Sequence, residues 1–250
     1  MKRKSQDKLL LEHRPAEIKK RLVRNRESHN LSDAVLGGID GCITTFAVVS
    51  GVFGAGLSPS IAIILGFGNL LADGFSMAVS NYESIKTHQD FIDGTRRDEE
   101  DHIDRFPGGE NEEIRQIFQR KGFEGDILEK VVDTITKDRG LWIETMLTEE
   151  HGLQKTSLRP YKSALVTFIA FASVGAIPIL PFLFPILEIS EQFSLSAVLA
   201  AIMFFLIGSL KSLYLDRPIV VSGLSTLVTG GTAASLAFFT GYVLRELFGV

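Results

Sequence analysis

The sequence predicts an all-α, polytopic membrane protein with five transmembrane helices and a soluble helical insert, and two observations support this prediction. First, five stretches are apolar over about 20 residues, which is the length that a helix needs to cross a bilayer. Second, a long and highly charged segment, residues 84–160, separates the second stretch from the third. The apolar stretches run from Ala34 to Phe53, from Ile61 to Val79, from Ala164 to Phe184, from Leu195 to Leu213 and from Ile219 to Leu244.

The chain begins with a basic segment, residues 1–30, in which ten Lys or Arg stand against four Asp or Glu. This segment has no apolar run long enough for a cleavable signal peptide, so we expect the first span itself to direct insertion. Basic residues near span ends favour the cytoplasmic side, and the loops of residues 54–60 and 185–194 contain none. We therefore expect the N-terminal segment and the insert in the cytoplasm. The other basic clusters are Lys155, Arg159 and Lys162 before the third span, and Lys211 and Arg217 where the fourth span passes into the fifth.

The spans divide into two groups, with residues 31–83 carrying the first two and residues 161–250 carrying the last three. The first, second and fifth spans are rich in Gly, Ala and Ser, which let membrane helices approach closely, so we expect a packed bundle. The third span contains prolines that should kink or end it. These are Pro178, Pro181 and Pro185.

Asp40 is the most informative residue of the first span. A carboxylate at membrane depth costs roughly 2.5 to 3.5 kcal/mol on the insertion scale, so membrane proteins rarely keep one without a use. Asp40 therefore indicates an ion or proton path. Cys42, the only cysteine, excludes an intrachain disulfide framework and is expected to be a packing residue, with a place along the path as the alternative. The separation of a basic N-terminus from an acidic insert argues against nucleic-acid binding.

The insert contains eighteen Asp or Glu against twelve Lys or Arg and is too long for a simple connecting loop. Apolar residues recur in it at helical spacing, and Pro107-Gly108-Gly109 and Gly122 interrupt the pattern. The sequence therefore predicts four amphipathic helices. Their expected bounds are Tyr82 to Phe106, Glu110 to Lys121, Asp126 to Lys137 and Gly140 to Thr156.

Three pairs of polar or sulfur-containing residues each share one face of these helices, because their members are three or four residues apart. Carboxylates and imidazole suit divalent first-row ions, and a thioether favours a softer ion such as Fe²⁺ over Mg²⁺ or Ca²⁺. An ordinary charged surface, with the methionine in the core, is the alternative interpretation. His151 should point away from this face on a continuous helix and is expected to be solvated. The pairs are Glu99 with His102, Glu110 with Glu113, and Met146 with Glu150.

Two sequence motifs resemble the vacuolar iron transporters, a family that includes the yeast vacuolar iron and manganese carrier and related plant proteins. The motifs run from Ser32 to Gly41 (SDAVLGGIDG) and from Gly74 to Tyr82 (GFSMAVSNY), and the resemblance extends from about Leu31 to the C-terminus. Family members with a cytoplasmic metal-binding domain have glutamates and a methionine at spacings that this chain matches. The matching residues are Glu99, His102, Glu110, Glu113, Met146 and Glu150.

The resemblance implies a homodimer that exports Fe²⁺, or a related ion such as Mn²⁺, from the cytoplasm in exchange for protons. The path would lie between the subunits, in a bacterial inner membrane or a vacuolar-type membrane. By the same resemblance, Asp40 and Met77 hold the ion midway across and Asp33 lies near the cytoplasmic entrance. The metal ion would be a substrate, and we expect no prosthetic group and no enzymatic activity. Simple helix packing is the alternative role for Met77.

Two positions depart from the family pattern. His102 stands where glutamate is usual, and an imidazole should lose metal on mild acidification sooner than a carboxylate does. Asn69 stands where the family often has glutamate, and an amide cannot carry a proton. Proton coupling would then use Asp40, Asp33 or Asp73, although Asp73 has a structural pairing role as its alternative.

Other functions remain open at the level of sequence. Glu99-x-x-His102 is a unit that ferritin-like di-iron proteins use twice, so a membrane-attached di-iron oxidase is an alternative, although the insert has only one copy. A metal store or a sensor that gates transport is a second alternative. A Mn²⁺ or Ca²⁺ carrier is a third, and the methionines argue against Ca²⁺.

Overall fold

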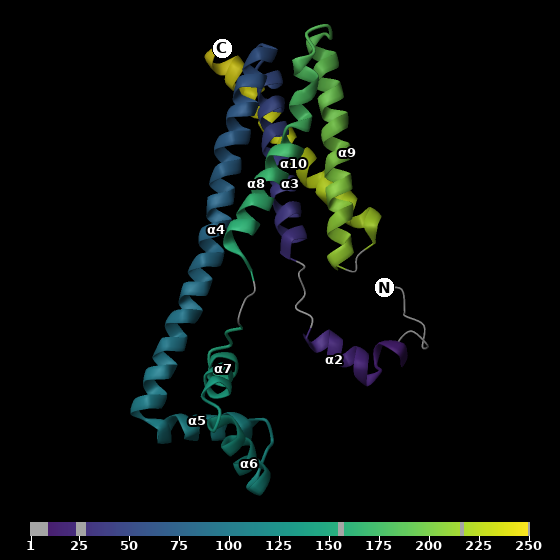
Figure 1. Cartoon of the computed structure of the whole chain (residues 1–250). Coiled ribbons are helices and arrows are strands. Elements are labelled where there is room, and N and C mark those ends of the chain that lie inside the picture. Colours follow the sequence, from purple (N-terminus) through teal and green to yellow (C-terminus); the bar gives the residue numbers. More distant parts are fainter. Residues whose placement is uncertain (1–9, 24–28, 155–157, 216–217, 250) are drawn as a thin grey trace. The chain divides into compact units, whose positions relative to one another are not determined.

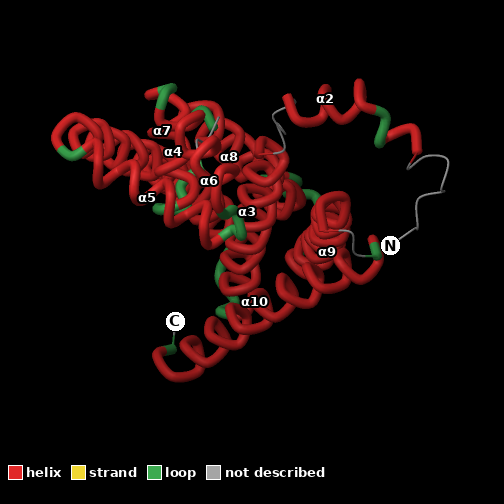
Figure 2. The backbone as a smooth tube through the Cα atoms, turned by 90° about the horizontal axis from the view of Figure 1, so that it is seen from below, coloured by secondary structure: helices red, strands yellow, loops and turns green. Residues whose placement is uncertain are grey.

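A computed structural model describes residues 10–23, 29–154, 158–215 and 218–249. Lys155 and Arg217, two of the basic residues near the ends of the predicted spans, lie outside these residues. The described chain consists of helices and connecting loops, with no strand (Figure 2). It divides into two compact units, which we call the membrane unit (residues 1–82 and 159–250) and the insert (Glu83–Leu158).

A short helix, α2 (Pro15–Val23), precedes the apolar helices of the membrane unit. Four helices are long and apolar enough to cross a membrane, and a bent pair supplies a fifth span. The predicted fold class, an all-α polytopic membrane protein, is therefore confirmed. The helices are α3 (His29–Gly54), α4 (Pro59–Arg105), α9 (Ile189–Leu215) and α10 (Ile219–Phe248), and the pair is α8 (Pro160–Gly175) with the 3₁₀ helix η1 (Ile177–Leu183).

The bend between α8 and η1, which measures 41°, falls where the sequence has two of its prolines. Pro178 and Pro181 have no backbone N–H to donate, so the helical hydrogen bonds cannot continue through them. The neighbouring helix α9 supplies a donor instead, because the Ser196 hydroxyl donates to the Pro178 carbonyl at 2.6 Å. The expected kink of the third span is therefore present.

Helix α3 lies in the middle of the membrane unit, in contact with α8, α9 and α10 (Figure 1). Glycine makes these contacts close. A Cβ atom added at Gly41 would lie 2.4 Å from the Phe171 carbonyl oxygen of α8, and one added at Gly54 would lie 2.2 Å from the Phe238 carbonyl oxygen of α10. The bundle is thus packed backbone against backbone, as expected from its small residues.

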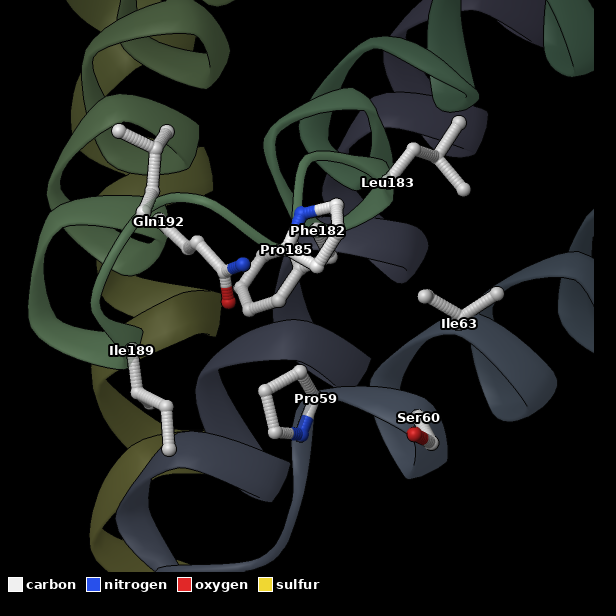
Figure 3. A pocket seen from close by; sticks show the side chains of 9 residues that line it. Pro59, Ser60, Ile63, Phe182, Leu183, Pro185, Ile189 and Gln192 are labelled. Atoms are coloured by element: carbon white, nitrogen blue, oxygen red, sulfur yellow. The ribbon is translucent and has the colours of Figure 1, made fainter.

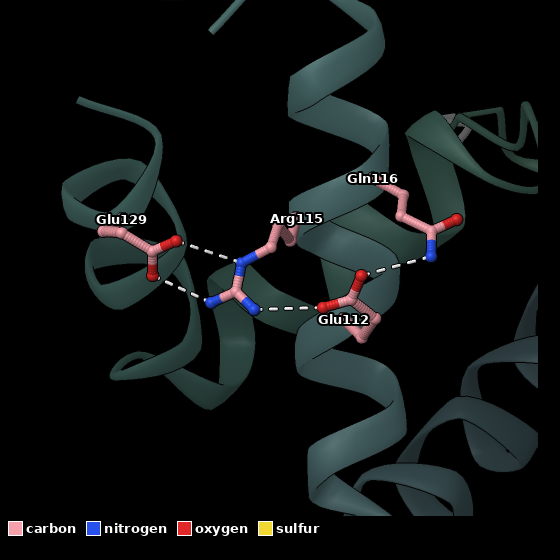
Figure 4. A network of polar contacts seen from close by, with 4 residues as sticks. All are labelled: Glu112, Arg115, Gln116 and Glu129. Atoms are coloured by element: carbon pink, nitrogen blue, oxygen red, sulfur yellow. Dashed lines mark hydrogen bonds and ion pairs between the residues drawn. The ribbon is translucent and has the colours of Figure 1, made fainter. Parts of the chain in front are cut away.

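The insert contains the second part of α4, together with α5 (Pro107–Arg120), α6 (Gly125–Thr136) and α7 (Arg139–Glu149). Its helices enclose one apolar core. On the surface, Arg115 of α5 donates two hydrogen bonds to Glu129 of α6, at 3.1 and 2.8 Å, and a third to Glu112 (Figure 4). The core residues are Ile103, Ile114, Ile117, Leu128, Val132, Ile135, Trp142, Ile143, Met146 and Leu147.

Two expected helix boundaries in the insert are wrong. Pro107, Gly108 and Gly109 form the first turn of α5 and not a loop, because proline fits the first helical position, where its missing N–H is not needed. Helix α7 ends at Glu149 and not near Thr156. Gly152 has φ +66°, a left-handed conformation that ends the helix.

Candidate functional site

The described part of the insert brings four of the expected acidic and imidazole residues together around Glu99, and adds one that was not expected. We call this group the insert cluster. In one half, the ligand atoms of Glu99, Glu150 and His151 lie within 4.8 Å of one another. In the other half, those of Glu99, His102 and Glu110 do the same. Glu99 thus belongs to both halves.

His151 is the unexpected member, and the prediction that it points away from the face of the metal-ligand candidates is wrong, although its side chain is a third exposed. Its Nε2 atom lies 2.9 Å from Glu99 Oε1 and 3.7 Å from Glu150 Oε2. The prediction failed because it extended α7 through residue 151, whereas the chain turns out of the helix after Glu149. In this turn the His151 N–H donates to the Met146 carbonyl and the Leu153 N–H donates to the Leu147 carbonyl.

Two carboxylates of the cluster are buried. Glu99 is 3% exposed and Glu110 is 5% exposed, and the Oε2 atom of each has no hydrogen-bond partner among the described residues. Burial is the main cause that raises the pKa of Glu110 to about 7, with the negative charges of Glu113 and Glu99 adding to it. Burial and the Glu113 charge also raise the pKa of Glu150. The nearby histidines oppose this rise only in part, because His102 lowers the pKa of Glu110 and His151 lowers that of Glu150.

The two histidines face this acidic group from opposite halves. The hydrogen bond to Glu99 is the main cause that raises the pKa of His151. His102 Nδ1 lies 3.5 Å from Glu110 Oε1. The arrangement therefore offers imidazole nitrogen as well as carboxylate oxygen, and this donor set suits divalent first-row ions.

Met146 is fully buried in the apolar core of the insert, in the same cluster as Trp142 and Leu147. Packing, which was the alternative interpretation, therefore accounts for its position. Its role as a ligand stays a prediction. Glu113 is exposed on α5, and its charge acts on Glu110, Glu150 and His151.

The start of α7 is held against α4, and this contact positions the insert cluster. Asp138 caps α7 by accepting hydrogen bonds from the N–H groups of Gly140 and Leu141, at 2.9 and 3.1 Å. Arg139 next to it donates two hydrogen bonds to the Asp104 carboxylate, at 2.6 and 2.9 Å, and one to the Glu100 carbonyl at 3.2 Å. Helix α7, which is followed by Glu150 and His151, is thus fixed at its beginning to the helix that carries Glu99.

The membrane unit has a second group of polar residues, where α3 and α4 form a hairpin. Residues equally far from the connecting loop lie at similar depth on the two helices. Asp40 lies 14 residues before Gly54, and Asp73 lies 14 residues after Pro59, which is about 21 Å along each helix. The Asp73 carboxylate is close enough to interact electrostatically with that of Asp40.

Two hydrogen-bonded contacts flank this pair of carboxylates along the hairpin. Toward the loop, the Asn69 amide donates to the Thr44 hydroxyl at 3.1 Å, and this hydroxyl donates to the Asp40 carbonyl at 2.9 Å. Toward the other end, the Asn81 amide donates to Asp33 Oδ1 at 3.1 Å and to the Thr167 hydroxyl of α8 at 2.8 Å. Sequence reasoning missed Thr44 and Asn81, although their distances from the loop would have paired them.

Asp33, Asp40 and Met77 are half-buried, whereas Asp73 is exposed on the surface of α4. Met77 packs against a cluster on α4, α8 and η1 that consists of Leu70, Phe171 and Ile179. Asp33 Oδ2 is a buried atom without a hydrogen-bond partner among the described residues. The hairpin thus presents carboxylates at two depths, and one of them lies on an open face.

A cavity of about 500 Å³ lies elsewhere in the membrane unit, where α4 and α9 begin, near η1 (Figure 3). Gln192 points into it, with its amide nitrogen bound to the Phe184 carbonyl at 3.0 Å. The lining has no carboxylate or imidazole, so this cavity is not a candidate cation site. The lining residues are Pro59, Ser60, Ile63, Phe182, Leu183, Pro185, Leu187, Ile189 and Gln192.

Comparison with known proteins agrees with the resemblance of the two motifs. Residues 31–242 match the profile of the VIT family, which covers both the hairpin and the insert. This chain belongs to the VIT family. Its VIT relatives include a protein named vacuolar iron transporter of Toxoplasma gondii, which is 30% identical over 90% of this chain and 78% of its own length. One from Centaurea cyanus is 31% identical over 87% of this chain and 91% of its own. A third, from Plasmodium berghei, is 30% identical over 89% of this chain and 85% of its own length.

Membership of the VIT family decides one of the open alternatives. The relatives are named as transporters and not as enzymes, so this chain is grouped with transporters and the di-iron oxidase alternative is set aside. The family match together with the apolar helices makes it an integral membrane protein.

Proposed function

We propose that this chain forms a homodimer that exports Fe²⁺, or a related divalent ion such as Mn²⁺, from the cytoplasm in exchange for protons. The name of its VIT relatives, vacuolar iron transporter, supports iron as the cargo. The carboxylates and imidazoles of the insert cluster support a divalent transition-metal ion, because these donors suit such ions. The methionines on α4 and α7 favour a softer ion than Ca²⁺ or Mg²⁺.

The pair of Asp40 and Asp73 is the observation that carries this proposal. Two carboxylates at the same depth of apolar helices are costly unless a cation or protons neutralise them. The pair can hold one divalent ion or two protons without leaving net charge in the membrane, which suits an exchanger. Asn69 has no proton to exchange, so the acid of this step is Asp73, one turn before Met77.

We assign the other residues of the path by their depth on the hairpin. Met77 adds a thioether near Asp73 without adding a second charge to desolvate. Asp33 lies 21 residues before Gly54, at the end of the hairpin far from its connecting loop, and accepts a hydrogen bond from Asn81. Since this end faces the cytoplasm in the proposed topology, Asp33 forms the cytoplasmic entrance. In this topology the N-terminal segment and the insert are cytoplasmic, and the insert cluster collects the ion before it enters the path.

The open face of α4 supports the homodimer. Asp73 is exposed at one side of this surface, and most of the remaining exposed surface of α4 is apolar, with Phe67 at 43%, Leu71 at 66% and Phe75 at 66% exposure. Lipid covers phenylalanine and leucine well, but a carboxylate beside them would remain unpaired. A second copy of α4 packed on this face encloses the carboxylates between subunits, where an ion can pass.

The test is the replacement Asp40→Asn, studied in sealed proteoliposomes that contain the full-length chain. An amide keeps the shape of the side chain but cannot carry the charge or the proton, so we expect metal-driven proton exchange to be abolished. The matched control is Asp98→Asn, an exposed carboxylate of α4 within the insert, which should leave the exchange rate unchanged. Retained proton-coupled flux in Asp40→Asn would refute the assignment of Asp40.

A folding check accompanies this test. Trp142 is the only tryptophan of the chain and lies in the core of the insert, so its fluorescence reports on the insert alone. Asp40→Asn should leave the response of this fluorescence to added Mn²⁺ intact, because Asp40 belongs to the other unit.

A further inference from the structure

The turn after α7 carries an imidazole whose geometry matches that of a metal ligand. Ligand atoms on a four-coordinate ion lie roughly 3.4 Å apart when each bond to the ion is about 2.1 Å long. His151 Nε2 lies 3.7 Å from Glu150 Oε2 and 2.9 Å from Glu99 Oε1. These two separations differ from that value by a few tenths of an ångström, and all three ligand atoms lie within 4.8 Å of one another, so small side-chain shifts would let them contact one ion. The His151 side chain is a third exposed, so solvent can deliver the ion.

Glu99 provides an independent indication that a cation belongs here. Its side chain is 3% exposed, and only one of its oxygens has a partner, namely His151. The other oxygen, Oε2, is buried without a hydrogen bond from any described residue, and so is Glu110 Oε2 in the other half of the cluster. Buried carboxylate oxygens without partners are rare because each pays the cost of desolvation. A bound cation would compensate both.

Each half of the cluster contributes one imidazole to this arrangement. Glu99 and Glu110 meet His102, whereas Glu99 and Glu150 meet His151, so the shared carboxylate lies between two nitrogen donors. Nitrogen donors strengthen the usual order of affinity, in which Mn²⁺ binds most weakly and Co²⁺, Ni²⁺ and Zn²⁺ bind more tightly. An imidazole on both sides therefore changes which ions the insert selects.

We propose that His151 is a metal ligand of the insert and that, together with His102, it makes the insert select Zn²⁺, Co²⁺ and Ni²⁺ over Mn²⁺. This inference rests on the proposed function, in which the insert binds divalent ions. The competing explanation is structural: the His151 imidazole only hydrogen-bonds Glu99 and holds the end of α7. A structural contact would affect all ions alike, so the ratio of two affinities separates the two explanations.

The experiment is a competition on the full-length protein in detergent, followed by Trp142 fluorescence. Bound Mn²⁺ is paramagnetic and should quench Trp142, and added Zn²⁺ should displace it and restore the emission. His151→Gln keeps a hydrogen-bond donor for Glu99 but removes the imidazole. We expect it to raise the Zn²⁺ concentration needed for half-displacement by about tenfold or more, the scale on which partners of metal ligands affect affinity. The matched control is His88→Gln, an exposed histidine of α4 outside the cluster, which should change nothing.

A second variant covers the case in which His151→Gln disturbs the fold. His151→Glu supplies an oxygen ligand of similar reach, so Mn²⁺ should still quench Trp142 while Zn²⁺ competes less well. An unchanged ratio of Zn²⁺ to Mn²⁺ affinity in both variants overturns the proposal for His151 and leaves the proposed function intact. Absence of Mn²⁺ quenching in the unmodified protein, by contrast, overturns metal binding by the insert and this inference with it.

Discussion

At the scale of single residues, Glu110 shows how a buried acid couples stability to metal binding. Its ordinary pKa of 4.5 rises to about 7 in the folded insert, mainly through burial. The folded state therefore holds a proton that the unfolded chain has already released between these two values. Stability falls as pH rises through this window, because the unfolded state binds fewer protons there. His151 acts in the same direction. Because its pKa is raised in the folded state, protonated His151 stabilises the fold at low pH, and this stabilisation is lost as pH rises through the pKa of the folded state.

The replacement Glu110→Gln tests this coupling. In metal-free protein, we expect the variant to lose much of the decline in stability between pH 4.5 and 7, and to exceed the unmodified protein above this window. Its affinity for Mn²⁺ should fall, because a carboxylate of the cluster is gone. The measurement is the thermal midpoint of Trp142 emission in the presence of a chelator, across pH. A decline of the thermal midpoint with pH as steep as in the unmodified protein would contradict the role of Glu110. The control for the lost negative charge is Glu144→Gln, at an exposed position of α7.

At the scale of helices, some features follow from the sequence and others do not. The spans and the bend at Pro178 and Pro181 were predictable, because apolar length and missing N–H groups act locally. The place of His151 was predictable but was missed, because the predicted helix was extended past Gly152. A glycine after the last apolar residues is a stop signal, and with it the sequence alone would have placed His151 in the terminating turn.

Contacts between helices were harder to predict than the helices themselves. The hydrogen bond between Asn69 and Thr44 depends on the register of two helices, and that register depends on the loop between Gly54 and Pro59. Counting residues from the loop would have found the contact. The burial of Glu99 could not be predicted, because it depends on three helices packing together around one core.

The end of α7 gives a prediction about backbone conformation. Gly152 has φ +66°, where any other L-residue is strained by roughly 1 to 2 kcal/mol. We expect Gly152→Ala to lower the stability of the insert by about this amount and to weaken Mn²⁺ quenching of Trp142, because the turn that carries His151 shifts. Gly94→Ala is the matched control, since this helical glycine of α4 has open space around it and alanine favours helix by about 1 kcal/mol. Equal losses in both variants would argue against this account.

The close contact of α3 with α8 gives a second prediction at this scale. A Cβ at Gly41 would lie 2.4 Å from the Phe171 carbonyl, so Gly41→Ala must separate the two helices. We expect a loss of roughly 1 to 3 kcal/mol, as for overpacking of a tight core. The thermal stability of the detergent-solubilised protein measures it. Gly68→Ala on α4, with nothing within 4 Å, is the control and should be neutral. The account fails if this control is the more damaging change.

At the scale of the whole molecule, the open face of α4 must be covered for Asp73 to work as proposed. A cysteine placed at Ser76, which is exposed and three residues after Asp73 on the same side of α4, tests this in a Cys42→Ala background that removes the only native thiol. We expect a short thiol-reactive linker to join two Ser76→Cys chains into a covalent dimer in membranes. Ile202→Cys, which is exposed on α9, should stay largely monomeric. The reverse pattern would place the dimer contact on another face and leave Asp73 facing lipid.

The central claim is that metal entry and proton movement are one exchange. The most direct measurement is Fe²⁺ uptake into sealed proteoliposomes under anaerobic conditions, with internal pH recorded at the same time and an imposed proton gradient as the variable. The account predicts that Fe²⁺ enters, that the interior becomes more alkaline as protons leave, and that an acidic interior accelerates both. Fe²⁺ that binds at the outer surface without entering, or enters with no change of internal pH, would contradict it.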